Sequence, residues 1–143
     1  MKQKKHSLQY EAEIEFEVLA ICSPFPDFRL IWNINKLAEL QLAKADKPFL
    51  FSSKKGDFTS SHSKYYWVDE VDEVQYMMLK NHELGNRLVP ELDQVDYFLF
   101  VQTDYNSPIQ IILKALIACD AVMAAFKLDV DAYPFFGMVQ ELS

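Results

Sequence analysis

Glycine is scarce in this sequence: three occur in 143 residues, at positions 56, 85 and 137. They lie too far apart to form a glycine-rich phosphate-binding loop, and neither a Walker A nor a Gly-x-Gly-x-x-Gly motif is present. Nucleotide binding through either of these motifs is therefore excluded.

Residues that bind metals or act as nucleophiles are also few. The two cysteines, Cys22 and Cys119, each lie within an apolar run, which predicts buried and reduced thiols. The three histidines lack metal-ligand spacing; a hairpin would bring His62 near His82, where we expect both to be solvent-exposed. No Gly-x-Ser-x-Gly elbow marks a serine nucleophile. We expect no metal, no cofactor and no catalytic residue.

Long uncharged runs are missing as well. The longest has nine residues, against about 20 needed for a membrane-spanning helix. The basic segment at 1–6 is followed by glutamates instead of an apolar stretch, so we expect no signal peptide.

The net charge is −7, with ten basic and eight acidic residues in 1–67 but four basic and thirteen acidic residues in 68–143. Such a chain repels phosphates, so we expect a cytoplasmic protein that binds neither nucleic acid nor membrane.

The pattern of apolar residues predicts one α+β domain over 1–143. Residues 8–18 alternate between apolar and polar, mostly glutamate, which is typical of a strand with one wet face. A helix capped by Asp27 is expected over 28–41, and a second after Ser107 as N-cap and Pro108 at the first helical position. The remaining expected strands are 42–53, a hairpin with arms 58–68 and 74–81, a central strand 95–101, and 121–128.

This order, β-α-β-β-β-β-α-β, predicts a ferredoxin-like variant with a mostly antiparallel sheet and two helices on one face. We expect 1–7 to be a flexible tail, 8–128 the core, and 129–143 a tail that packs back or onto a partner. The glutamates of the first strand should line the face opposite the helices. Strand aromatics should leave part of that face apolar and free to meet another molecule. On the first helix, Phe28 and Trp32 form a second apolar stripe that must be covered by this chain or by a partner.

Two acidic segments are candidate functional features. Glu91, Asp93 and Asp96 lie close together before the central strand, where they would cap backbone groups or pair with Arg29 or Arg87. The less favoured interpretation is general acid–base work. The segment 69–73 is a solvated hairpin tip, with a docking patch for a basic partner as the alternative.

The segment 89–97, Val-Pro-Glu-Leu-Asp-Gln-Val-Asp-Tyr, resembles the signature of the IPExxxVDY family of small bacterial proteins from Bacteroidetes. Val89 stands where the family name has isoleucine, and the named positions from Pro90 to Tyr97 match. The resemblance extends over most of the chain. It implies a bacterial, cytoplasmic origin and no defined activity.

Three functional hypotheses follow. The first is a non-enzymatic protein-interaction or regulatory module that acts as a homodimer or binds a protein partner. The second is a small-ligand-binding domain, by analogy with ferredoxin-like folds. The third is an acid–base enzyme that uses Glu91 and Asp96. The expected binding residues are Arg29, Trp32, Asn35, Glu91, Asp96 and Tyr97.

Overall fold

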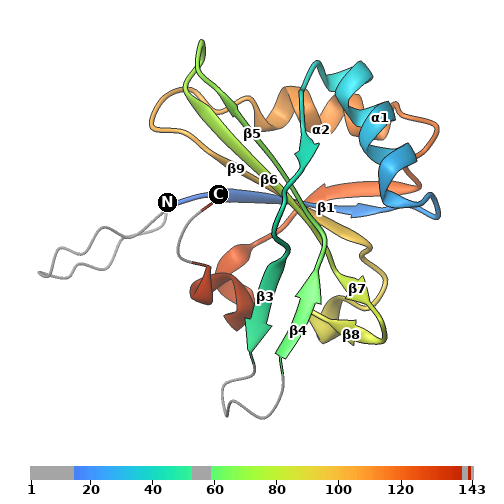
Figure 1. The fold of residues 1–143 in the computed structure, drawn as a ribbon. Coiled ribbons are helices and arrows are strands. Elements are labelled where there is room, and N and C mark those ends of the chain that lie inside the picture. The colour runs from blue at the N-terminus through green and yellow to red at the C-terminus, as the bar shows by residue number, and fades with distance from the viewer. Residues whose placement is uncertain (1–14, 53–58, 140–141, 143) are drawn as a thin grey trace, which may run out of the picture.

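The computed structural model of the chain describes residues 15–52, 59–139 and 142. It is an α+β fold with a six-stranded antiparallel sheet and two α-helices (Figure 1). The sheet has the order β10-β1-β9-β6-β5-β2. Its strands are β1 (Glu17–Cys22), β2 (Ala43–Lys44), β5 (Lys64–Asp69), β6 (Val74–Lys80), β9 (Tyr97–Gln102) and β10 (Ala124–Lys127).

Shorter elements flank this sheet. Two separate strand pairs are formed by β3 (Phe49–Ser52) with β4 (Thr59–His62) and by β7 (His82–Glu83) with β8 (Asn86–Arg87). The α-helices are α1 (Asp27–Ala38) and α2 (Ile109–Ile117). The 3₁₀ helices are η1 (Pro90–Leu92), η2 (Val130–Ala132) and η3 (Pro134–Met138). No helix among the described residues is long and apolar enough to cross a membrane.

One face of the sheet is covered by α1 and α2, which also contact each other. Each helix buries one stripe at helical spacing, as their sequences predict. Leu19, Ile21 and Leu99 meet these stripes from the central strands. The helical side of the core is completed by Leu30, Ile31, Ile34, Ile109, Ile112 and Leu116.

The opposite face is also covered, and our prediction of a free, aromatic-rich half of the sheet is wrong. Phe98 and Phe100 are fully buried there. The ring of Phe136, on η3, contacts both, with ring centroids 5.5 and 5.8 Å apart. The β3–β4 pair joins this cluster through Phe49 and Phe51, whose rings both contact Phe135. The C-terminal segment is apolar enough to pack back on its own sheet, so no partner is needed to bury these rings.

The described part of the first predicted strand is β1, which continues past residue 18 to Cys22. Residues 8–14 of the predicted strand lie outside the described residues, and β1 is apolar on both faces between β9 and β10. Glu17 shares the helical side with Leu19 and Ile21, contrary to the expected position of the glutamates. Its carboxylate accepts hydrogen bonds from Ser107 at 2.6 Å and from Lys127 at 2.8 Å.

Other boundaries differ by a few residues for local reasons. The predicted strand 42–53 divides into β2 and β3, in separate sheets on either side of Pro48. The helix α1 begins at Asp27 instead of being capped by it, and it ends before Glu39, which is left-handed (φ 58°). Ile109 donates to the Ser107 hydroxyl at 3.2 Å, although α2 starts one residue after the predicted position. The hairpin of β5 and β6 and the central strand β9 are confirmed. The predicted first arm, 58–68, is wrong in its first half, because β4 pairs with β3 and the arm that pairs with β6 is β5.

Candidate functional site

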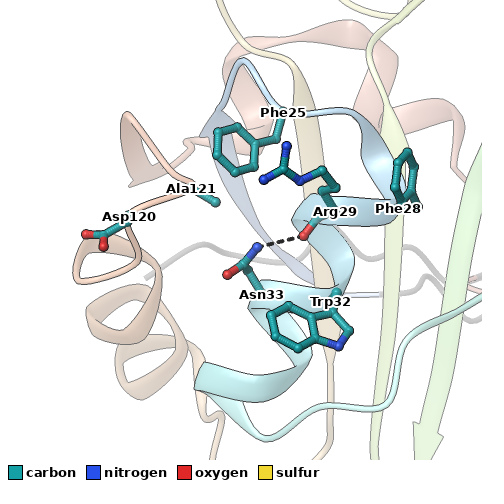
Figure 2. Close-up of a pocket in the computed structure, with 7 residues that line it drawn as sticks. All are labelled: Phe25, Phe28, Arg29, Trp32, Asn33, Asp120 and Ala121. Atoms are coloured by element: carbon teal, nitrogen blue, oxygen red, sulfur yellow. Dashed lines mark hydrogen bonds between the residues drawn. The ribbon is translucent and has the colours of Figure 1, made fainter.

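The candidate site is a groove between the outer surface of α1 and the loop that follows α2 (Figure 2). Its volume is about 470 Å³, which lies within the range of small-molecule and peptide-anchor sites. Aromatic rings supply most of the wall from the α1 side. Lining residues are Phe25, Phe28, Arg29, Trp32, Asn33, Asp120 and Ala121.

Two aromatic side chains of this groove lie largely in solvent. Phe28 is 66% exposed and Trp32 is 63% exposed, an unusual state for rings of this size. Cations rest on two rings: the Arg29 guanidinium lies 4.6 Å from the Phe25 centroid, and the Lys36 ammonium lies 4.9 Å from the Trp32 centroid. The second apolar stripe predicted on this helix therefore exists and is not covered by the described part of the chain.

Hydrogen bonds from the segment 95–97 hold the groove in shape. Asp96 accepts a 2.8 Å hydrogen bond from the Ser23 amide, and the Tyr97 hydroxyl donates to the Phe25 carbonyl at 3.2 Å. The Ser23 hydroxyl donates to the Ala121 carbonyl at 2.6 Å and accepts from the Phe25 amide at 3.1 Å. These bonds join the two walls of the groove, because Phe25 lies on one and Ala121 on the other.

The rest of the family-like segment is organised by one buried side chain, Asn81. Its amide nitrogen donates to the carbonyls of Leu92 and Val95, at 3.1 and 2.9 Å. Its oxygen accepts from the amides of Leu88 and Val89, at 2.9 and 3.0 Å. A single asparagine thus pairs four backbone groups that the turns of this segment leave without strand partners.

The six predicted binding residues do not come together in one cavity. Arg29 and Trp32 line the groove. Asn35 instead holds the chain after α1, through two 3.0 Å hydrogen bonds with the backbone of Leu42. Glu91 is exposed on η1. Asp96 and Tyr97 lie beneath the groove and act on it only through residues 23–25.

Two of the three acidic side chains before β9, Asp93 and Asp96, are bonded to other parts of the chain. Asp93 pairs with Arg87, as the favoured interpretation predicts. The Asp96 carboxylate is engaged by the Ser23 amide. Burial raises the pKa of the Tyr97 hydroxyl, and the charges of Asp27 and Asp96 raise it further, so this hydroxyl stays protonated and donates to Phe25. Nothing in this geometry pairs an acid with a base across a cleft.

A serine–histidine pair occurs elsewhere, on β4. The Ser60 oxygen lies 2.8 Å from His62 Nε2, and His62 Nδ1 lies 2.8 Å from the Lys80 carbonyl. A carbonyl only accepts, so Nδ1 carries the proton and Nε2 accepts from the serine. Our prediction of a solvent-exposed His62 is wrong: it is fully buried, and Ser60 is 4% exposed. The pair resembles an activated nucleophile in distance alone, since a substrate has no access to it.

The Cys22 thiol is not activated either. Burial raises the pKa of the Cys22 thiol, and the Asp96 carboxylate raises it further. Both cysteines are free among the described residues, and Cys119 is buried. A raised pKa keeps Cys22 a thiol at neutral pH, which is the less reactive form.

Four groove residues were missed by the sequence analysis: Phe25, Asn33, Asp120 and Ala121. Phe25 and Asn33 flank the stripe of Phe28 and Trp32, which was recognised. Asp120 and Ala121 had no signal in the sequence, because they reach the groove through the contact between Ser23 and Ala121, 98 positions apart.

Comparison with protein-family models, curated proteins and solved structures found no match in any of the three. The resemblance of segment 89–97 to the IPExxxVDY signature therefore stays a prediction.

Proposed function

We propose that this chain is a non-enzymatic protein-interaction module that acts as a homodimer and pairs through the outer surface of its two helices. The observation that carries the proposal is the group of exposed apolar side chains on the helices, each at least 62% exposed. We call it the helix-layer surface, and it consists of Phe28 and Trp32 on α1 and Ile111 and Ile117 on α2.

A second copy suits this surface because it carries both a projection and a hollow. Trp32 and Phe28 project beside a cavity of about 470 Å³ on the same side of the molecule. A two-fold axis presents each such surface to its own copy, so the rings of one protomer can enter the groove of the other. Homodimer interfaces are more apolar than the rest of a protein surface, and a specific interface of standard size buries about 800 Å² on each partner. This surface has the required chemistry, and two neighbouring helices give it breadth.

We also propose that the fold is a ferredoxin-like variant. When the strands β2 to β5 that follow α1 are left out as an insertion, the strands around the two helices are β1, β6, β9 and β10. Their order in the sheet is β10-β1-β9-β6. This is the interleaving expected of two split β-α-β units, with every neighbouring pair antiparallel. The strands β2 and β5 then extend the sheet on one side, and β3–β4 is an added arm.

The alternative is a small-ligand-binding domain, which the size and apolar lining of the groove favour. It requires the groove to be open to solvent in the working protein, whereas the homodimer closes it. The acid–base enzyme has less support, because neither Glu91 nor Asp96 lines the groove and the Asp96 carboxylate is bonded to the Ser23 amide.

The test is the oligomeric state in solution, measured by analytical ultracentrifugation over a range of concentrations. Wild-type protein should dimerise, and Trp32→Ala should weaken the dimer about thirtyfold or more, as expected for a central tryptophan worth about 2 kcal/mol. Leu50→Ala is the matched control, because Leu50 is 65% exposed on β3, on the other side of the sheet. It should leave the dimer unchanged.

A strictly monomeric wild-type protein overturns the homodimer. A dimer that Trp32→Ala leaves intact places the interface elsewhere and overturns the proposed surface.

A further inference from the structure

The groove carries one charge of each sign, on opposite walls. Arg29 projects from α1, and its guanidinium rests on Phe25, while Asp120 lies across the groove in the loop after α2 (Figure 2). Both residues are exposed. Among the described residues, no ion pair joins either of them to an opposite charge.

The positions of these charges suit a symmetric partner. A two-fold axis through the groove exchanges its walls, so that Arg29 of one protomer faces Asp120 of the other, and the reverse pair forms at the same time. The stacking of Arg29 on Phe25 restricts the guanidinium before a partner arrives, which reduces the entropy that pairing costs. The groove is thus complementary to itself in charge.

We propose that two Arg29–Asp120 ion pairs, related by the two-fold axis, set the register of the homodimer. This inference rests on the proposed function, and it adds the orientation of the two protomers and the specific contacts between them. Charge pairs at an interface determine orientation and exclude wrong partners more than they add affinity. The apolar side chains supply the affinity, and the ion pairs select the one arrangement in which Trp32 meets the groove.

The experiment is a charge-reversal complementation, measured by analytical ultracentrifugation at low ionic strength. Arg29→Asp places like negative charges opposite each other twice in a homodimer, and Asp120→Arg does the same with positive charges. Each single variant should dimerise about tenfold or more weakly than wild type. An equimolar mixture of the two variants should recover the dimer, because the heterodimer contains two opposite-charge pairs.

A variant that carries both reversals should also dimerise, since each protomer again presents one charge of each sign. Circular dichroism and thermal unfolding of each variant check that the exposed substitutions leave the fold intact. If wild type dimerises but the mixture is no tighter than either single variant, the ion-pair register is overturned while the proposed function stands. A monomeric wild type overturns both.

Discussion

Replacing Asn81 should unfold the segment that carries the family-like signature. In Asn81→Ala, the amide of Val89 and the carbonyl of Val95 lose their hydrogen-bond partner. The other two backbone groups keep a second partner: the Leu88 amide donates to the backbone carbonyl of residue 81, and the Leu92 carbonyl accepts from the Val95 amide. Val89 and Val95 are 1% and 2% exposed, so water reaches these groups poorly. At about 1–3 kcal/mol for each unpaired buried group, the free energy of unfolding should fall by about 2–6 kcal/mol.

A loss of this size is a large fraction of the total stability of a domain, which is about 5–15 kcal/mol. The assay is urea unfolding followed by tryptophan fluorescence, with the midpoint and slope fitted together. Asn33→Ala is the matched control, because Asn33 makes one hydrogen bond, to the Arg29 carbonyl within α1. Its free energy of unfolding should change by no more than about 0.5 kcal/mol.

Asn81→Asp separates hydrogen bonding from shape. It keeps an oxygen for the amides of Leu88 and Val89 but turns a second oxygen toward the carbonyls of Leu92 and Val95. A buried carboxylate in that position has a raised pKa, so the loss of stability should grow as the pH rises above about 4. The reasoning is refuted if Asn81→Ala lowers the free energy of unfolding by less than about 1 kcal/mol with an unchanged slope.

Two further predictions concern single residues. Leu84 lies beside Gly85 in the β7–β8 turn, where its backbone is left-handed (φ 50°) and its side chain is 95% exposed. Because asparagine adopts this conformation more easily than leucine, Leu84→Asn should raise the free energy of unfolding, measured in urea, by about 1 kcal/mol. Val71→Asn, at another exposed turn, should give no gain. Burial lowers the pKa of His62, and its bond to the Lys80 carbonyl and the charge of Glu83 oppose this only in part. As the pH drops, His62 is therefore protonated first in the unfolded chain, so the free energy of unfolding falls below a pH of about 6.5. In His62→Gln this part of the pH dependence of the free energy of unfolding should vanish. An unchanged pH profile in this variant would exclude His62 as its source.

Periodicity and turn chemistry predicted the elements whose signals are local. The stripes of α1 and α2, the hairpin around Val71 and the central strand β9 each repeat one pattern over several residues, and they lie where the patterns indicate. Boundaries were less well predicted. The alternation of 8–18 did not predict the end of β1, because burial between β9 and β10 extends this strand through the apolar run to Cys22.

The contacts that decide the site are not local. The sequence predicted that the apolar C-terminal segment packs on a surface, but not whether that surface is its own sheet or a partner. The contacts of Phe136 with Phe98 and Phe100 show that it is its own sheet. As a result, the expected interaction surface moved from the sheet to the helices. Phe28 and Trp32 were the useful signal, because two aromatic residues one turn apart on the polar side of an amphipathic helix have no intrahelical reason to be there.

The segment 89–97 illustrates why a distinctive motif need not be a binding site. Its buried backbone groups are paired with Asn81, Asp93 is paired with Arg87, and Asp96 and Tyr97 are bonded to the loop before α1. Polar groups engaged in this way have little left to offer a ligand. What they determine is where Phe25 and Ala121 lie, and therefore the width of the groove. The distinctive residues are thus the support, and the surface that we propose as the dimer interface is built from ordinary helix residues above them.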